Sequence, residues 1–236
     1  MRKDARGDAI LVLFARAPRA GGVKTRLAGA IGDAAALDLH RAFLLDTIHT
    51  MHRASHEGVV RTVWFSEPWE PDEEVSRALD GIAVGAQPPG ELGERMQACL
   101  LDLLTGGYRR VVILGADSPT LPVKFIVRAV TALADRDVVL GPADDGGYYL
   151  VGARTVIPEM FRGIAWGGPS VYADTVRVLR LLGAAPVELP PWHDVDTAED
   201  LTRLRADLAS WPPAGAEGEP PPRETIRALA RLDSGA

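Results

Sequence analysis

Short apolar runs alternate along the chain with segments in which apolar residues recur at helical spacing. Residues 10–14 and 111–114 are unbroken apolar runs, which are typical of strands buried on both faces of a sheet. Residues 33–53 carry apolar side chains on one helical face, and Asp33 can cap this helix at its start. The alternation of buried strands and helices predicts an α/β fold with a mostly parallel sheet that helices cover on both faces.

The remaining elements and the domain limits follow from the same pattern. We expect further strands at 59–65, 82–84, 138–140, 148–151 and 187–189, and further helices at 92–104, 123–133, 170–182 and 197–208. Five prolines and two glycines at 211–222 are typical of a linker. The predicted organisation is an N-terminal extension (1–8), a single domain (9–210), the linker (211–222) and a short C-terminal helix with its tail (223–236). That last helix would either dock onto the domain or bind a partner.

Composition and charge exclude several classes of protein. The 236 residues are 47% hydrophobic and 25% charged, as in ordinary soluble globular proteins, and no stretch approaches the roughly 18 apolar residues of a membrane span. The net charge of −6 argues against broad binding to a nucleic-acid backbone. Cys99 is the one cysteine, which excludes an internal disulfide and fits a reducing compartment, and its apolar neighbours indicate burial. The apolar run near the N-terminus is short for a signal peptide, and Asp4 and Asp8 interrupt the basic region, so we expect a cytoplasmic protein.

A basic loop follows the first predicted strand. It contains four cations and two glycines: Arg16, Arg19, Gly21, Gly22, Lys24 and Arg26. Ligands of open α/β sheets bind beyond the C-terminal ends of the strands, so the loop predicts a site for a di- or triphosphate. The alternative is a solvated basic loop. It is not a Walker P-loop, because Val23 and Arg19 stand where that motif needs glycine.

Three aspartates follow other predicted strands. Asp117 comes after the strand at 111–114, and Asp194 and Asp196 form an Asp-x-Asp pair before the last helix of the domain. Three hard oxygen ligands, with the basic loop at the other end of the cleft, suit Mg²⁺ that bridges a nucleotide diphosphate, while Lys24 neutralises charge that grows in the transition state. The alternative is that these aspartates only cap helices. His193 beside the pair is more typical of a hydrogen-bonded structural histidine.

Five motifs, which occur in order over about residues 9–208, resemble the DUF2064 family. They are Phe14-Ala-Arg-Ala-Pro18 with Gly22-Val-Lys-Thr-Arg-Leu27, Leu92-Gly-Glu-Arg-Met96, Gly115-Ala-Asp-Ser-Pro119, Gly141-Pro-Ala-Asp-Asp-Gly-Gly-Tyr-Tyr-Leu150 and Asp194-Val-Asp-Thr-Ala-Glu-Asp-Leu201. The resemblance implies the GT-A fold of the nucleotide-diphospho-sugar transferases, with three α/β/α layers and a mostly parallel mixed sheet. Members are commonly called glycosyltransferases, including a subgroup of arsenosugar biosynthesis. The framework is also similar to the 2-phospholactate guanylyltransferases, whose Lys-Ser-Arg-Leu segment parallels residues 24–27.

The resemblance assigns roles to residues of this chain. It implies that three aspartates bind Mg²⁺ or Mn²⁺: Asp117, Asp194 and Asp196. The candidate residues for nucleotide or phosphate binding are Arg16, Gly21, Gly22, Lys24, Thr25, Arg26 and Arg95. Asp145, Gly146 and Gly147 are expected near the second substrate, although they could form only an acidic hairpin turn. Lys24 and Asp145 are the candidate catalytic residues, Asp145 as a general base for the acceptor. Ser118 stands where many members have cysteine, which disfavours a mechanism based on a thiol.

These residues are compatible with three functions. The first is a magnesium-dependent glycosyltransferase that uses a nucleotide-sugar donor and a small-molecule acceptor. The second is a nucleotidyltransferase that joins a nucleoside triphosphate to a small phosphorylated acid and releases pyrophosphate, because both reactions need the same metal and cations. The third is a non-catalytic nucleotide-binding protein, which the complete acidic set disfavours. The base, the sugar, the acceptor and the oligomeric state stay open.

Overall fold

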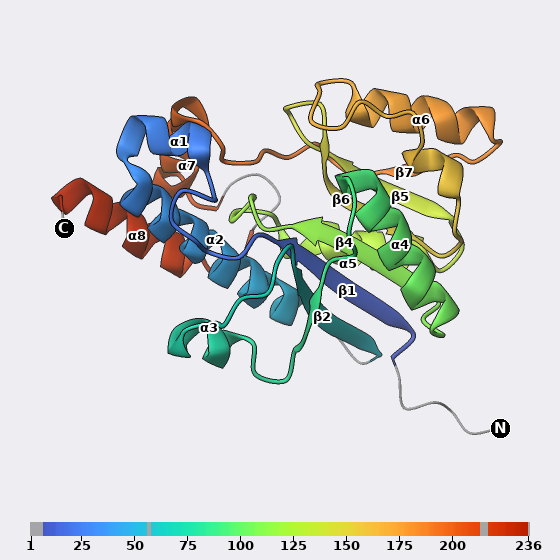
Figure 1. Ribbon diagram of the computed structural model, residues 1–236, viewed down its shortest axis with the longest axis horizontal. Helices are drawn as coiled ribbons and strands as arrows, with labels where there is room; N and C mark the ends of the chain where they lie inside the picture. The colour runs from blue at the N-terminus through green and yellow to red at the C-terminus, as the bar shows by residue number, and fades with distance from the viewer. Residues whose placement is uncertain (1–6, 56–57, 213–216, 236) are drawn as a thin grey trace.

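A seven-stranded mixed sheet runs through the middle of the protein (Figure 1). The structure is a computed structural model that describes residues 7–55, 58–212 and 217–235. The strands are β1 (Ala9–Ala15), β2 (Val59–Phe65), β3 (Ala83–Ala86), β4 (Arg110–Gly115), β5 (Val138–Pro142), β6 (Tyr148–Ala153) and β7 (Val187–Glu188). They lie in the order β3-β2-β1-β4-β6-β5-β7. Strand β6 is antiparallel to its neighbours β4 and β5, and the other neighbouring pairs are parallel. The predicted α/β fold with a mostly parallel mixed sheet is confirmed.

Helices cover both faces of this sheet. They are α1 (Thr25–Ile31), α2 (Asp33–Ala54), α3 (Glu73–Ala78), α4 (Leu92–Thr105), α5 (Val123–Ala132), the 3₁₀ helix η1 (Pro158–Phe161), α6 (Val171–Leu181), α7 (Ala198–Ala209) and α8 (Arg223–Ser234). Alternate residues of β1 point to opposite faces, as the pleat requires. Leu11 and Leu13 pack in a cluster with residues of α2, α3 and α5, whereas Val12 and Phe14 pack in a cluster with residues of α4, η1 and α6. Burial on both faces explains the unbroken apolar run of this strand.

A third hydrophobic cluster joins four helices at one side of the sheet. Helices α1, α2, α7 and α8 lie together there (Figure 1). Leu27 of α1, Phe43 of α2, Leu204 of α7 and Leu229 of α8 are among its members. Of the two alternatives for the C-terminal helix, docking onto the rest of the protein is therefore the one observed.

Asp46 of α2 fixes the beginning of α8. Its buried carboxylate accepts the backbone N–H groups of Glu224 (3.3 Å) and Thr225 (2.8 Å), which an isolated helix would leave without partners. The predicted linker includes residues 213–216 and the predicted N-terminal extension includes residues 1–6, and these residues lie outside the described part of the chain.

Some local elements differ from the sequence pattern. Helices α1, α3 and η1 lie in segments for which no helix is predicted, and each is seven residues long or shorter. Asp33 is the first residue of α2 and not its cap, because Gly32 takes the cap position with φ 86°, a conformation that glycine adopts without steric cost. Across the described ranges, none of the helices has both the length and the apolar character needed to cross a membrane.

Candidate functional site

The loops that follow β1 and β4 meet at one edge of the sheet. The two strands are parallel neighbours, so their C-terminal ends lie side by side. From β1 the chain order runs to β2 and β3 on one side and to β4 and β6 on the other. Ligand sites of open α/β sheets form at such a change of direction. Lys24 follows β1 and Asp117 follows β4, so both lie where this rule places a ligand.

A third segment is attached to the same edge. The Val195 N–H donates to the carbonyl oxygen of Asp117 (3.0 Å), which brings Asp194 and Asp196 beside the loop after β4. The side chain that caps α7 is Thr197, which forms a capping box with Asp200. Asp194 and Asp196 are therefore not used as caps of this helix, which was the structural alternative for them.

Lys24 lies among the acidic residues and not across the cleft from them, which corrects the expected separation of the basic loop from the acids. Its Nζ contacts Asp117 Oδ1 and lies 2.8 Å from Asp196 Oδ1 and 5.5 Å from the centre of the Phe43 ring. The side chain is only 2% exposed. Burial alone would lower the pKa of Lys24, but the two carboxylates more than offset this and raise it, so the amine is an ammonium.

Each acidic side chain has a different environment. Burial would raise the pKa of Asp117, but the charge of Lys24 and the hydrogen bond from Lys24 hold it below its ordinary value, so Asp117 is ionised. Asp194 accepts a hydrogen bond from Ser118 Oγ (2.5 Å). Burial and then the charge of Asp117 raise the pKa of Asp194 to about 7, and Asp145 adds to the shift. The site therefore contains one ionised acid held by Lys24 and one that titrates near neutrality.

The basic loop only partly points toward these acids. Arg16 Nη1 lies 3.4 Å from the Gly22 carbonyl oxygen, and Arg19 donates to the Pro68 carbonyl oxygen (2.6 Å). Arg26 is exposed near the start of α1. Two other candidate residues for phosphate binding in this segment, Gly21 and Thr25, are also exposed. Lys24 is thus the cation that the loop delivers to the acids, whereas Arg16 and Arg26 remain at the surface beside it.

Arg95 belongs to a different part of the same sheet edge. Its Nη1 donates to Gln87 Oε1 (2.8 Å), and Gln87 Nε2 donates to the carbonyl oxygens of Ala15 (3.2 Å) and Trp64 (2.9 Å). Arg95 Nε is buried without a hydrogen-bond partner among the described residues. Gln87 therefore ties Arg95 to the ends of β1 and β2, a connection that the sequence pattern did not predict.

Asp145, Gly146 and Gly147 form the turn between β5 and β6. Asp145 Oδ1 accepts the Gly147 N–H (2.8 Å), and Gly146 has φ 90°. A Cβ atom on Gly146 would lie 1.9 Å from the Pro169 carbonyl oxygen, and the Gly146 carbonyl oxygen accepts the Tyr172 N–H (2.8 Å). This close approach fixes the turn against the beginning of α6. The acidic turn that was the alternative to a substrate site is therefore present. Within it, Asp145 is exposed and lies near enough to Asp194 to raise the pKa of Asp194.

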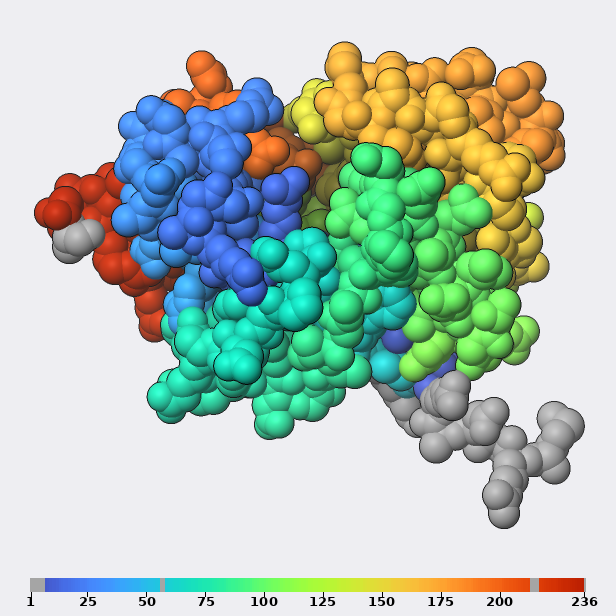
Figure 2. All heavy atoms as spheres, in the orientation of Figure 1, coloured from blue at the N-terminus to red at the C-terminus, as the bar shows by residue number. Residues whose placement is uncertain are grey.

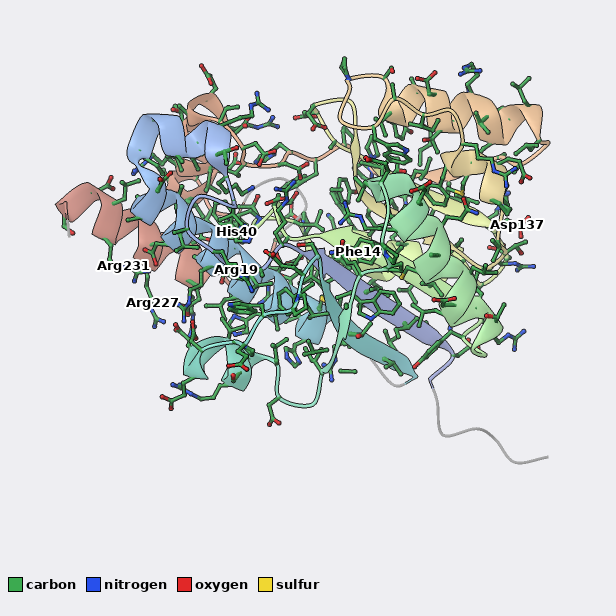
Figure 3. All side chains as sticks on the ribbon, viewed as in Figure 1. Phe14, Arg19, His40, Asp137, Arg227 and Arg231 are labelled. Carbon is green, nitrogen blue, oxygen red and sulfur yellow. The ribbon has the colours of Figure 1, made fainter. Side chains whose placement is uncertain are left out.

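Two histidines lie near the site. His40 of α2 is buried with Nε2 3.1 Å from the Arg16 carbonyl oxygen, and burial lowers its pKa, so the ring is neutral near pH 7 (Figure 3). His193 is buried, stacks on Trp192 with ring centres 5.3 Å apart, and lies with Nε2 3.0 Å from Asp207 Oδ2. These contacts favour a structural role for His193.

The acidic side chains fit a divalent cation in their chemistry, but they are not arranged as a cage. Within the described residues, no three acidic, histidine or cysteine side chains are close enough together to hold a metal ion. The reason is that the Lys24 ammonium lies between Asp117 and Asp196 while Asp194 pairs with Ser118. The ammonium nevertheless acts as a stand-in cation on two of the three predicted ligands. Carboxylate oxygens are the ligands that Mg²⁺ and Mn²⁺ prefer, so these aspartates are the residues that would hold such an ion.

The surface is hollowed on the face that carries this edge. Figure 2 shows a depression between the blue atoms that follow β1 and the green and yellow atoms of α4 and the region after β5. Orange atoms of the segment before α7 lie along it. The loop that follows β1 and the segment that precedes α7 thus border the same depression.

Comparison with known proteins adds the family. The profile of the family described as "Uncharacterized protein conserved in bacteria (DUF2064)" matches residues 47–168. The chain belongs to the DUF2064 family. This DUF2064 protein is also 30% identical to a protein of Desulfovibrio desulfuricans G20 that is described as a nucleotide-diphospho-sugar transferase. That comparison covers 97% of this chain and 96% of the other, with a TM-score of 0.80. The predicted family and the fold of this transferase group are confirmed.

More distant structures share only the fold with this DUF2064 protein. A 4-diphosphocytidyl-2C-methyl-D-erythritol synthase is 13% identical with a TM-score of 0.55, covering 85% of this chain and 98% of its own. Rv0371c of Mycobacterium tuberculosis H37Rv, solved in complex with manganese, is 18% identical with a TM-score of 0.50, covering 84% and 97%. No curated protein matches the chain.

Proposed function

We propose that this DUF2064 protein is a glycosyltransferase that depends on a divalent cation, takes its sugar from a nucleotide-diphospho-sugar donor and transfers it to a small-molecule acceptor. The observation that carries the proposal is the meeting of Lys24, Asp117, Asp194 and Asp196 at the edge where β1 and β4 end. The likeness over almost the whole chain to a protein described as a nucleotide-diphospho-sugar transferase supports the same class of donor.

The acidic residues would hold the cation. Asp117, Asp194 and Asp196 offer hard oxygen ligands on two segments that the Val195–Asp117 backbone hydrogen bond joins. When bound, Mg²⁺ or Mn²⁺ would withdraw charge from the diphosphate leaving group. A protein that shares this fold, Rv0371c of Mycobacterium tuberculosis, forms a complex with manganese, which supports a divalent cation as the metal.

The basic residues would neutralise the remaining charge of the diphosphate. Lys24 is held at the site, and Arg16 and Arg26 lie on the adjacent loop and helix. Because the leaving diphosphate gains negative charge as the sugar–oxygen bond breaks, cations fixed beside it lower the barrier. Arg95, which Gln87 holds at the same sheet edge, would bind the nucleotide farther from the acids.

The turn between β5 and β6 would serve the acceptor. Asp145 is exposed, and its neighbours Gly146 and Gly147 have no side chains that could cover its carboxylate. A carboxylate in that position could accept the proton of an acceptor hydroxyl as the new bond forms. We therefore propose Asp145 as the general base.

A nucleotidyltransferase is the second candidate. In that reaction the acceptor attacks the α-phosphate of a nucleoside triphosphate and pyrophosphate leaves. The concentration of cations after β1 favours it, because Lys24, Arg16 and Arg26 together suit a triphosphate as well as a diphosphate. The acidic residues would have the same role in both reactions.

One assay separates the two candidates. The protein is incubated with Mg²⁺, a panel of UDP- and GDP-sugars and hydroxyl-bearing small acceptors, and in parallel with nucleoside triphosphates and phosphorylated acids. Release of a nucleoside diphosphate from a sugar nucleotide supports glycosyl transfer. Pyrophosphate release from triphosphates, with every sugar nucleotide left intact, contradicts it and supports the second candidate. Asp137, which pairs with Arg154 (3.2 Å) and not with Lys24, provides a control. Loss of the product signal in Asp117→Asn, but not in Asp137→Asn, assigns the activity to this site.

A further inference from the structure

Lys24 occupies a position that a divalent cation would need. Its Nζ contacts Asp117 Oδ1 and lies 2.8 Å from Asp196 Oδ1, so one ammonium shares two of the three predicted metal ligands. Mg²⁺ binds carboxylate oxygen at about 2.0–2.1 Å, so an ion on these oxygens would lie against the ammonium. Two like charges in contact inside a partly buried site repel strongly. Ion and ammonium therefore exclude each other from these oxygens.

We propose that Lys24 is an exchangeable counter-ion: its ammonium neutralises Asp117 and Asp196 in the metal-free protein, a divalent cation displaces it, and the displaced ammonium then binds the diphosphate of the substrate. The proposal rests on the proposed function, because it takes the same aspartates as metal ligands. It adds an order of events at the site and a reason why metal and diphosphate bind together.

The backbone at Lys24 favours such an exchange. Lys24 has φ 48° and ψ 38°, and it is the one residue other than glycine with positive φ in the described part of the chain. This conformation is unfavourable for a residue with a side chain, and it persists when surrounding contacts hold it. The contacts here are those with Asp117, Asp196 and the Phe43 ring. Loss of the two carboxylates to a metal ion would remove both ion pairs of the Lys24 side chain, while the Ala28 N–H would still donate to the Lys24 carbonyl oxygen (2.8 Å) and hold the backbone at the start of α1.

The surroundings indicate where the released ammonium would go. Lys24 has a flexible four-carbon side chain and stands between the exposed Gly21 and Gly22 on one side and Arg26 on the other. Besides the two carboxylates, the surroundings of Lys24 include the Phe43 ring, the exposed Arg26 and two glycines that have no side chain, and they suit an anion better than a second carboxylate. A diphosphate bound beside the metal would hold Lys24 away from Asp117 and Asp196. By linkage, each ligand then raises the affinity for the other.

The lysine content of the chain makes the exchange measurable. The sequence has three lysines: Lys3, Lys24 and Lys124. Lys24 is 2% exposed and paired to carboxylates, whereas Lys124 is 58% exposed. Acylation of lysine amines by acetic anhydride, followed by mass spectrometry of the peptides, reports the accessibility of Lys24 with Lys124 as an internal reference.

The experiment compares the metal-free protein, the protein with Mn²⁺, and the protein with Mn²⁺ and inorganic pyrophosphate. Electron paramagnetic resonance of free Mn²⁺ gives the binding curve on the same samples. We expect acylation of Lys24 to be low without metal, to rise along the Mn²⁺ binding curve, and to fall again with pyrophosphate, while acylation of Lys124 stays constant. Mn²⁺ binding without any rise at Lys24 would overturn the exchange but leave the proposed function intact.

Two variants complete the test. Lys24→Met removes the competing ammonium, and Arg16→Met removes a nearby cation for which the structure shows no ion pair with the carboxylates and which acts on Asp117 through its charge alone. We expect Lys24→Met to bind Mn²⁺ about tenfold more tightly than the wild type, a size typical of coupling between linked sites, and Arg16→Met to change the affinity much less. Equal effects of the two variants would mean that only general electrostatics is at work and would contradict the exchange.

If the wild type binds no Mn²⁺ without pyrophosphate, the Lys24→Met variant is tested under the same conditions. Binding of Mn²⁺ by this variant would support the proposal that the Lys24 ammonium blocks the metal ligands. Absence of binding would contradict that proposal. Failure of every protein to bind Mn²⁺, even with pyrophosphate, would overturn the metal site and with it the proposed function. A normal exchange at Lys24 combined with no transfer of any sugar would contradict the proposed function alone.

Discussion

Ser118 donates its hydroxyl to Asp194 Oδ1 at 2.5 Å and so fastens an acid of the site to the loop after β4. Ser118 is itself buried, and Asp194 belongs to a segment 76 residues later in the chain. The hydroxyl stabilises the ionised form of a carboxylate that burial and Asp117 would otherwise protonate. The Ser118–Asp194 hydrogen bond therefore both positions the Asp194 carboxylate and favours its ionised form.

The stability of the metal-free protein should fall as the pH rises toward 7 because of Asp194. Burial and then Asp117 raise its pKa to about 7, above the value of about 3.9 in an unfolded chain. The raised pKa means that its stabilising contribution is complete below pH 4 and is lost as the pH rises through 7. Urea unfolding between pH 4 and 8 should show this loss in the wild type but not in Asp194→Asn. In Ser118→Ala, which lacks the hydrogen bond that lowers the pKa, the loss should move to higher pH. The same pH dependence in wild type and Asp194→Asn would contradict the assignment.

Asp117→Asn should abolish most of the binding of Mn²⁺ without unfolding the protein. The substitution keeps the size of the side chain but removes a charged oxygen ligand. Changes outside the ligands of a metal typically cost 10–100-fold in affinity, so we expect a loss of at least about tenfold here. Calorimetry with Mn²⁺ measures it. Asp137→Asn is the control, because Asp137 pairs with Arg154 away from the site (Figure 3). An unchanged affinity in Asp117→Asn would show that this aspartate is no ligand.

Asp46→Ala should destabilise the fold through helix α8. Asp46 is 4% exposed and accepts two backbone N–H groups at the beginning of that helix. Leaving buried donors without partners costs about 1–3 kcal/mol in the free energy of unfolding. Asp38→Ala is the matched control on the same helix pair, since Asp38 holds Arg231 of α8 in an exposed ion pair, for which the expected cost is about 0–1 kcal/mol (Figure 3). Chemical denaturation of both variants tests the difference, and an equal cost would contradict the capping role of Asp46.

Gly146→Ala should disturb the turn more than its positive φ alone explains. Gly146 and Gly81 have φ 90° and 71°, so alanine at either position costs about 1–2 kcal/mol for the left-handed backbone. Only at Gly146 would the added Cβ meet another atom, the Pro169 carbonyl oxygen at 1.9 Å, whereas Gly81 has open space. We therefore expect thermal unfolding to show a clearly larger loss for Gly146→Ala than for Gly81→Ala. Similar losses would mean that the turn moves freely away from Pro169.

The main elements of the fold could be predicted because their signals are local. The apolar run of β1 reflects burial on both faces, and the expected strand at 59–65 coincides with β2. Helix α1 gave no such signal, because it buries a single residue, Leu27, and contains Gly29. Its position depends on contacts with α2 that the local sequence does not contain.

The members of the site could be named from the sequence, but their contacts could not. Lys24 and Asp196 are 172 residues apart, and no local pattern shows that an ammonium lies between two predicted metal ligands. His40, Gln87 and Ser118 were missed as partners of the site for a related reason. Each lies in a regular element or a loop where its residue type is ordinary, and only the folded chain brings it to the sheet edge.

The docking of α8 also has a consequence for synthesis on the ribosome. Asp46 belongs to the first long helix, yet its partner Glu224 follows 178 residues later. Through most of translation, α2 therefore carries a carboxylate and an apolar surface that have no partner yet. The cluster that supports Lys24 and Val195 closes only when the last helix leaves the exit tunnel. A nascent chain that stops short of residue 223 would leave the apolar surface of α2 exposed to solvent, so the packing around Phe43 and Val195 is complete only after α8 has been synthesised.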